Sequence, residues 1–203
     1  MPQVKTAFRL DTFTTQLTIL NVDYQLCDGI LPSCTVMHNL DHEMPLLVVW
    51  PRSTQAVQHN HQLTYPLKQP NGIPITVMSG GHGYEGKSMG KRITLVLQHK
   101  YACYLEGEEL FVQPGAGLRK VMDALFQHER ILPHGDSLTV GAGGHYISAG
   151  WDLVLTRKYG LGCQHVQSAT MVHWDGTVEK VTCESNPELL HGIRGCFGYF
   201  KGI

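Results

Sequence analysis

The sequence lacks a long hydrophobic run and an excess of charge of either sign. No apolar stretch in its 203 residues approaches the roughly 20 that a membrane-spanning helix needs, and the N-terminus has no apolar signal core. Only 16% of the residues are charged, and the formal net charge is −1. We therefore expect no binding to nucleic acid or to an anionic membrane. With no sorting signal visible, the compartment stays unassigned, with the cytoplasm as the default expectation.

Cysteine spacing gives no support for a zinc site or a disulfide framework. The six cysteines are scattered without a C-x-x-C pair. Cys27 and Cys34 alone are close enough in sequence for a small disulfide loop, but free, buried thiols are the favoured interpretation. Of the 12 histidines, His59 and His61 are two apart, a spacing that does not share a helix face. We expect that pair to lie mostly on the solvated surface, and we expect no metal.

Glycine is abundant and clustered. Of the 22 glycines, 15 gather in 79–90, 115–117, 141–150 and 192–202. Hydrophobic residues make up 42% of the chain, enough for one domain or two small ones with a real core. The clusters therefore indicate loops that approach a ligand or another loop closely, rather than a disordered linker.

Periodicity and turn residues predict alternating strands and helices. In the first half we expect a helical face over 6–20, irregular chain over 21–44, a strand at 46–50, a helix over 54–63 that begins after Ser53, and strands at 75–78 and 93–98. In the second half we expect hairpins at 101–113 and 166–182, and helices over 118–128, 152–159 and 187–193, the last capped by Asn186.

The loop after the strand at 75–78 carries the clearest chemical signal. It reads Ser-Gly-Gly-His-Gly-Tyr-Glu-Gly over 79–86, with one imidazole, that of His82, among four glycines. Successive backbone N–H groups in such a turn can form a concave anion site. Glycine content alone fits equally well a tight turn that only reverses the chain.

Several motifs in order resemble one flavoprotein superfamily. They are Pro51-x-Ser-Thr54, the 72–86 stretch, Val112-x-Pro-Gly-Ala-Gly117, Pro133-x-Gly135, Val140-Gly-Ala-Gly-Gly-His145, 157–161, Asp175-Gly-Thr-Val178 and Leu189-Leu-x-Gly-Ile-Arg-Gly195. The series resembles the flavin-binding half of the vanillyl-alcohol oxidase or p-cresol methylhydroxylase (PCMH) superfamily. Within it, the berberine-bridge-enzyme and oligosaccharide-oxidase branch is the most similar.

The resemblance implies an α+β protein with the FAD-binding PCMH-type fold of two α+β subdomains. We expect an N-terminal extension at 1–43, then the FAD-binding domain at 44–203, divided into about 44–100 and 101–203. The family continues with a substrate domain, and this chain ends where that domain would begin. We therefore expect a truncated product, a fragment or a stand-alone flavin carrier.

The same resemblance assigns cofactor-binding positions for FAD. The first glycine loop would wrap the diphosphate, for which backbone N–H donors suffice. His82 occupies the position of a histidine bonded covalently to the flavin 8α-methyl, although a noncovalent role in the pocket remains an alternative. The assigned positions are Ser79, Gly80, Gly81, His82, Gly83, Tyr84, Ser88, Ser137, Val140, Gly141, Gly144, His145, Gly150, Tyr159, Gly160, Leu161 and Val166.

Four departures from the family pattern affect what the chain can do. Ser137 stands in the segment where bicovalent members carry a second flavin-linked cysteine, and a serine cannot form that thioether. Met78 replaces a usual arginine, and Gln164 a usual aspartate. Trp151 and Asp152 replace glycines along the approach to the flavin, which would narrow it.

Two functional hypotheses remain open, with catalytic residues unassigned in both. The first is an FAD-binding oxidoreductase domain that takes hydride from an alcohol, sugar or related C–H substrate, with O2 as the acceptor. The second is a degenerate, non-catalytic flavin-binding module or a fragment without its substrate domain. A histidine-rich metal-binding protein is a minor third reading, because no convergent ligand spacing is visible. We expect a small-molecule substrate as partner; whether the chain is itself an enzyme, and its oligomeric state, stay open.

Overall fold

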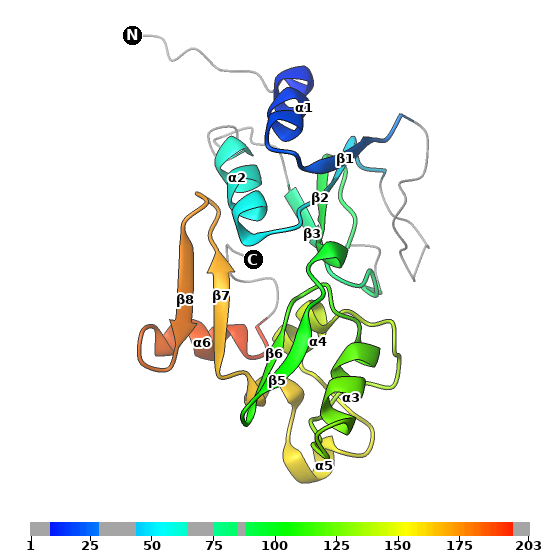
Figure 1. Ribbon diagram of the computed structural model, residues 1–203, viewed down its shortest axis with the longest axis vertical. Helices are drawn as coiled ribbons and strands as arrows, with labels where there is room; N and C mark the ends of the chain where they lie inside the picture. The colour runs from blue at the N-terminus through cyan, green and yellow to red at the C-terminus, as the bar shows by residue number, and fades with distance from the viewer. Residues whose placement is uncertain (1–8, 29–43, 65–74, 85–87, 197–203) are drawn as a thin grey trace.

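A four-stranded sheet forms the first half of the protein (Figure 1). The computed structural model describes residues 9–28, 44–64, 75–84 and 88–196. The strands of this sheet are β1 (Asp23–Leu26), β2 (Leu47–Trp50), β3 (Ile75–Met78) and β4 (Ile93–Val96). In the order β1-β2-β4-β3, β4 pairs in parallel with both β2 and β3, and β1 pairs antiparallel with β2.

The central strands are buried because their sequences are continuously apolar. Every residue of β2 and all four of β4 are buried, which is typical of inner parallel strands. Helices α1 (Leu10–Ile19) and α2 (Thr54–Thr64) belong to this half. Phe13 and Leu17 of α1 join one core cluster with Leu47 and Leu95 of the sheet.

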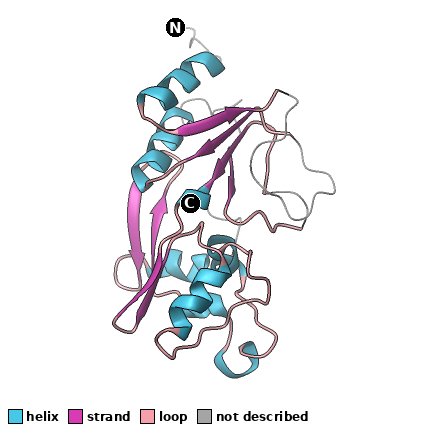
Figure 2. Ribbon diagram, turned by 45° about the vertical axis from the view of Figure 1, so that its right-hand side comes forward, coloured by secondary structure: helices cyan, strands magenta, loops and turns pink. Residues whose placement is uncertain are grey.

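The second half combines two hairpins with short helices (Figure 2). Its core gathers residues of two helices, with Leu118, Val121, Leu125 and Tyr146 all buried. The elements are β5 (Cys103–Glu106), β6 (Glu109–Val112), α3 (Leu118–Phe126), α4 (Ala142–Ser148), α5 (Thr156–Tyr159), β7 (Ser168–Val172), β8 (Val178–Thr182) and α6 (Pro187–Ile193). Two short 3-10 helices lie at η2 (Leu97–His99) and η3 (Gly162–His165).

The two halves meet through a small apolar cluster. Val57 of α2, Leu97 of η2 and Val172 of β7 are each nearly or fully buried and pack together. Figure 1 accordingly shows the β7–β8 hairpin rising beside α2. The mixed, layered arrangement confirms the predicted α+β class.

Three predicted segments differ from the structure. The 21–44 region is not irregular throughout, because 23–26 forms β1 on the edge of the sheet. The strand predicted at 93–98 ends at Val96, where the backbone turns into η2. The helix predicted over 152–159 covers only α5, because the Asp152 carboxylate accepts hydrogen bonds from the N–H groups of Val154 and Leu155 and holds that segment in a turn.

The glycine cluster at 141–150 contains a helix that glycine content had concealed. Residues 142–148 form α4 despite Gly143 and Gly144, because Tyr146 and Ala142 are buried against α3. Tertiary packing therefore outweighs the low helix propensity of glycine here.

The predicted surface position of the histidine pair was wrong for His61. Its side chain is 2% exposed and meets Trp174 edge-to-face, with ring centroids 6.1 Å apart. The turn of the β7–β8 hairpin covers that face of α2, which the helix sequence alone does not reveal.

The five described cysteines are free thiols. Cys27 and Cys163 are buried, as expected, whereas Cys183 and Cys196 are exposed. Cys34, the other member of the possible small loop, lies outside the described residues. None of the described helices is both long and apolar enough to cross a membrane.

Candidate functional site

A cleft of about 330 Å³ opens where the parallel strands β3 and β4 end. One wall comes from the ends of these strands and the loop after β3, and the other from segments 115–117 and 138–141. Its lining residues are Met78, Ser79, Gly80, Val96, Gln98, Gly115, Gly117, Leu138, Thr139 and Gly141. The carboxyl edge of parallel strands is where open α/β layers commonly bind ligands.

Glycine is required where the two walls touch. A Cβ at Gly80 would lie 2.2 Å from the Gly141 nitrogen, and a Cβ at Gly141 would lie 2.3 Å from the Gly80 nitrogen. Gly81 has a φ of 72°, in the left-handed region that side-chain-bearing residues rarely adopt. The junction is therefore made of bare backbone from both sides.

Further contacts fix the first glycine loop on the second half of the chain. The Ser79 hydroxyl donates a hydrogen bond to the Pro114 carbonyl. Gly117 and Gly141 form a β-bridge, within which Leu118 donates to Val140 and Ala142 donates to Ala116. The cleft walls are thus held by backbone hydrogen bonds and by one short side chain, that of Ser79.

The cleft is suited to binding an anion through backbone N–H groups rather than through charged side chains. The backbone N–H groups of Gly80 and Gly81 make no hydrogen bond within the described part of the chain. Among the described residues, no lysine, arginine, aspartate or glutamate lines the cleft. A diphosphate can be held by several N–H groups that approach it closely without a cationic side chain. The residues present therefore fit the diphosphate of a dinucleotide such as FAD.

His82 lies beside this junction and faces the opposite loop. Its Nε2 is 2.9 Å from the Thr139 hydroxyl oxygen, across 57 positions in the sequence. Thr139 in turn lies 3.5 Å from the Ser137 hydroxyl oxygen. The structure thus brings His82 and Ser137, two predicted positions, to the same hydroxyl group.

The second glycine loop carries a partly buried histidine, His145, with a structural contact. His145 Nε2 accepts a hydrogen bond from the Gly135 N–H at 3.2 Å, and the ring packs edge-to-face on Tyr146. Burial, followed by the charge of His134, lowers the pKa of His145, while Asp152 opposes that shift. The neutral imidazole is the form that accepts this hydrogen bond.

Asp152 is held ionised at a buried position near that histidine. It is 5% exposed, and its carboxylate lies 3.8 Å from His134 Nδ1. Burial raises the pKa of Asp152, but the hydrogen bonds from the N–H groups of Leu155 and Val154, together with His134, outweigh burial and lower it overall. Asp152 therefore shapes the chain before α5, and the neighbouring Trp151, 55% exposed, is left on the surface.

Comparison with known proteins decides the family. The FAD binding domain family matches residues 45–182, about two thirds of the chain. The chain belongs to the FAD binding domain family. The predicted superfamily and the predicted cofactor, FAD, are thereby confirmed.

Curated relatives of this FAD binding domain are oxidoreductases. It is 33% identical over 135 residues to FAD-linked oxidoreductase dpmaF of Metarhizium anisopliae, covering 64% of this chain and 26% of the relative. It is 34% identical over 135 residues to chitooligosaccharide oxidase of Gibberella zeae, covering 64% and 27%. Berberine bridge enzyme-like 4 of Arabidopsis thaliana is 32% identical over 149 residues, covering 70% and 28%. The chain thus spans little more than a quarter of the length of these curated relatives.

Solved structures share the fold of this FAD binding domain. FgChi7B superposes with a TM-score of 0.84 at 22% identity, covering 95% of this chain and 41% of that one. The glucooligosaccharide oxidase of Acremonium strictum gives a TM-score of 0.79 at 25% identity, covering 90% and 39%. The description of that oxidase names a 6-S-cysteinyl, 8α-N1-histidyl FAD. The predicted PCMH-type fold is confirmed by these likenesses.

The remaining predicted positions of the FAD binding domain lie around the cleft or away from it. Gly83 donates its N–H to the Ser88 hydroxyl at 3.2 Å, Tyr84 is 82% exposed, and neither lines the cleft. Gly86 lies outside the described residues. A Cβ at Gly144 would meet nothing within 4 Å, so there is open space beside it.

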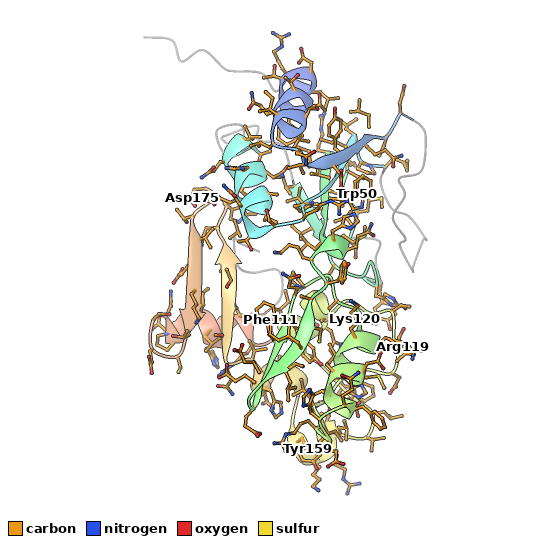
Figure 3. All side chains as sticks on the ribbon, in the orientation of Figure 1. Trp50, Phe111, Arg119, Lys120, Tyr159 and Asp175 are labelled. Carbon is orange, nitrogen blue, oxygen red and sulfur yellow. The ribbon has the colours of Figure 1, made fainter. Side chains whose placement is uncertain are left out.

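Positions 150–166 are explained by packing within the FAD binding domain. Gly150 has a φ of 66°, and a Cβ there would lie 2.7 Å from the Gly162 Cα. Gly160 has a φ of 80°, and Leu161 donates its N–H to the Gln164 side chain. In Figure 3, Tyr159 lies at the bottom of the molecule, far below Trp50, which ends β2 in the upper half. The Val166 carbonyl accepts from Arg194 Nε at 2.7 Å.

Several cleft residues of the FAD binding domain were not among the predicted cofactor positions. None of them is charged. The Pro-Gly-Ala-Gly turn was the only sequence signal, and it marks just Gly115 and Gly117. The residues missed are Met78, Val96, Gln98, Gly115, Gly117, Leu138 and Thr139.

Proposed function

We propose that this chain is the flavin-holding part of an FAD-linked oxidoreductase that oxidises a C–H bond of an alcohol, a sugar or a related small molecule, with O2 as the acceptor. Relatives named as FAD-linked oxidoreductase and chitooligosaccharide oxidase support this proposal. When bound, FAD supplies the hydride acceptor for such a reaction. The chain contributes binding and orientation.

The observation that carries the proposal is the glycine-lined cleft at the ends of β3 and β4. Its two walls come from residues up to 98 and from residues 115 onward, which supports a division between about 44–100 and 101–203. Gly80, Gly81 and Gly141 let the backbone approach the diphosphate closely. The other assigned cofactor positions remain part of the proposal.

We also propose that His82 tethers the flavin. It lies beside the cleft junction, and the 25%-identical glucooligosaccharide oxidase carries an 8α-N1-histidyl FAD. A neutral imidazole is nucleophilic near neutral pH. With Ser137 in place of a thiol, we expect one tether in this chain.

An absorbance spectrum before and after denaturation tests both proposals. The purified chain, supplied with FAD, is expected to be yellow, and the flavin is expected to stay with the polypeptide after acid precipitation. His82→Ala should bind FAD yet release all of it on denaturation. A folded chain that takes up no FAD would contradict the flavin-binding function, and complete release from the wild type would contradict the tether alone.

A second candidate is a flavin-binding module without turnover. None of the ten residues lining the described cleft has a titratable side chain, so no general base faces that space among them. A coupled assay for H2O2 with mono- and oligosaccharides and simple alcohols separates the candidates. Flavin-dependent H2O2 release that requires substrate supports the oxidoreductase, whereas a yellow protein without release supports the module.

A further inference from the structure

Thr139 joins the two loops of the cleft through a side chain that contacts His82. It comes from the segment before α4, and its hydroxyl oxygen is 2.9 Å from His82 Nε2. The Thr139 backbone carbonyl also lies against Gly80, 3.0 Å from where a Cβ would be. Thr139 is thus fixed at the junction by its backbone while its side chain meets the imidazole.

We propose that Thr139 is the positioning residue for flavin attachment, which it directs to the Nδ1 atom of His82. This inference rests on the proposed tether. A neutral imidazole has one protonated and one nucleophilic nitrogen. When Nε2–H donates to the Thr139 hydroxyl, Nδ1 carries the lone pair, and the ring plane is fixed at the same time.

The surroundings of Thr139 are compatible with that direction of the hydrogen bond, because Ser137 offers a second hydroxyl group next to it. The Ser137 hydroxyl oxygen lies 3.5 Å from the Thr139 hydroxyl oxygen. The hydroxyl proton of Thr139 can therefore point toward Ser137. Thr139 then accepts from His82 and points its own proton toward Ser137. This order makes Nδ1 the nucleophile, in agreement with the N1-histidyl linkage named for the glucooligosaccharide oxidase.

The attachment step balances with O2 as the oxidant. The Nδ1–C8α bond forms and one C8α–H bond breaks, with that proton passing to water. The second proton leaves from Nε2 through the Thr139 hydroxyl, so the linked imidazole is neutral. The two electrons released pass through the flavin ring to O2, which with two protons becomes H2O2.

Thr139→Val tests the proposal because it keeps the shape of the side chain and removes the hydroxyl. The protein is made in riboflavin-limited cells, FAD is added, and the fraction of flavin that survives acid precipitation is followed with time. We expect attachment to slow by about 10-fold or more, since the nucleophile is no longer oriented. The Kd for noncovalent FAD is measured by fluorescence quenching in an His82→Ala background with and without Thr139→Val, so that attachment rates are compared at saturating FAD.

Two further variants distinguish orientation from folding. Thr139→Ser, which keeps the hydroxyl, should restore most of the attachment rate. Thr18→Val makes the same exchange on the exposed face of α1 and should leave the rate unchanged. NMR of the isolated flavin peptide should show substitution at Nδ1.

The outcomes separate this inference from the function on which it rests. Attachment by Thr139→Val at the wild-type rate, or a wild-type linkage at Nε2, would overturn the role of Thr139 and leave the tether standing. A wild type that binds FAD but never attaches it would overturn both the tether and the role of Thr139. A wild type that binds no FAD would refute the flavin-binding function itself.

Discussion

At the scale of single residues, the structure places the hydroxyl of Ser137, the position where the resemblance predicts a flavin-linked cysteine in bicovalent members, close to the junction. The Ser137 hydroxyl oxygen and His82 Nε2 both lie near the Thr139 hydroxyl, so the two side chains face a shared space. Sequence order identified both positions, but only the structure shows that Thr139 connects them. A serine has no thiolate to attack a flavin ring carbon.

Ser137→Cys should therefore add a second tether. The S–C6 bond would form as the thiol S–H bond and the flavin C6–H bond break, and O2 would take up the two electrons and two protons as H2O2. In the His82→Ala, Ser137→Cys double variant we expect flavin to remain on the denatured polypeptide, whereas His82→Ala alone should release it. Ser148→Cys, which places a thiol at the exposed end of α4, serves as the control. Release of all flavin from the double variant would show that position 137 does not reach the ring.

His145 should make stability fall in mildly acidic solution. Its pKa is lowered from 6.5 in the folded chain, chiefly by burial, so the unfolded chain binds the proton more readily. The stability that neutral His145 contributes is complete above pH 6.5 and is lost as the pH falls through the lower folded value. Urea unfolding at pH 7.5 and 5.5 should show a loss of up to about 1.4 kcal/mol per pH unit in the wild type.

His145→Gln provides the comparison for that loss. Its side-chain oxygen can still accept from the Gly135 N–H without titrating, so its stability should change less between the two pH values. His128→Gln, at an exposed position after α3, should behave like the wild type. Equal pH dependence in wild type and His145→Gln would assign the loss to other groups.

At the scale of elements, the sequence predicted the bounds of those strands and helices that are set by residues next to them in the chain. The strand at 75–78 and the helix at 187–193 have the predicted bounds. In the sequence, Asn71 and Pro74 come before the strand, and Asn186 caps the helix that Pro187 begins. β1 was missed because its residues pair with β2 across 20 intervening positions, and its alternation of polar and apolar residues is only four residues long. The short α4 was missed because its stability comes from burial of Tyr146, which no local pattern encodes.

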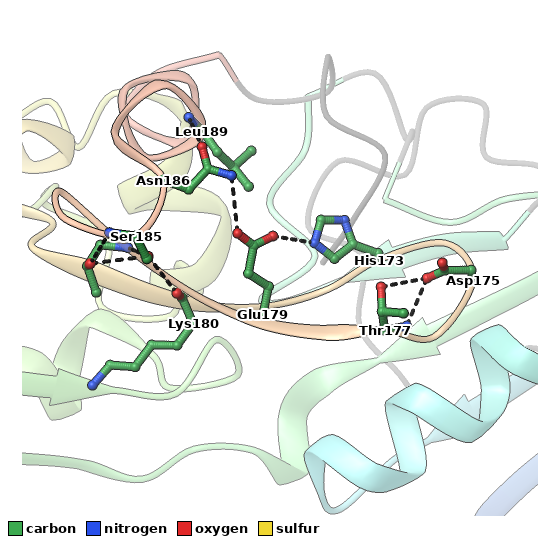
Figure 4. A network of polar contacts seen from close by, with 9 residues as sticks. His173, Asp175, Thr177, Glu179, Lys180, Ser185, Asn186 and Leu189 are labelled. Atoms are coloured by element: carbon green, nitrogen blue, oxygen red, sulfur yellow. Dashed lines mark hydrogen bonds and ion pairs between the residues drawn. The ribbon is translucent and has the colours of Figure 1, made fainter.

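The start of α6 illustrates how one side chain can hold two elements (Figure 4). Asn186 accepts from the Leu189 N–H at 3.1 Å and donates to Glu179 of β8, also at 3.1 Å. The hydrogen bond from Asn186, followed by that from His173, lowers the pKa of Glu179. The network thus links the helix cap to the β7–β8 hairpin.

Asn186→Ala should lower the free energy of unfolding by about 1–2 kcal/mol, since the cap and the cross-link are lost together. Asn186→Asp keeps the cap but faces Glu179 with a like charge, so we expect an intermediate loss that shrinks in acid, where protonation of one of the two carboxylates relieves the repulsion. Denaturant unfolding at pH 7 and 4 measures both. A change of less than about 0.3 kcal/mol for Asn186→Ala would show that Pro187 alone defines the start of α6.

At the scale of the whole molecule, the cleft exists because backbone of the two halves of the chain comes into direct contact at Gly80 and Gly141. The sequence predicted the glycines of both walls, and the motif order predicted that they would serve one dinucleotide. It could not predict that Gly80 and Gly141 touch, because that contact depends on how β3 and the segment before α4 are placed by separate cores. Binding of FAD to both walls should therefore stabilise the docking of the halves as well as each half.

The substitution Gly141→Ala should weaken the contact between the two halves of the molecule. Its Cβ would lie 2.1 Å from the Ser79 side-chain oxygen and 2.3 Å from the Gly80 nitrogen, so the loops must separate. We expect a loss of about 1–3 kcal/mol in stability from the overpacked contact. The rise in Tm that saturating FAD gives the wild type should be greatly reduced.

Gly144→Ala is the matched control for stability. It places the same methyl group three residues along α4, where nothing lies within 4 Å, and it should raise stability by about 0.5–1 kcal/mol, because alanine is the better helix former. Thermal unfolding of the three proteins, each with and without FAD, separates overpacking from a general effect of glycine replacement. If Gly141→Ala unfolded at the wild-type temperature with an undiminished response to FAD, the close contact between the two loops would not be what couples the halves of the molecule.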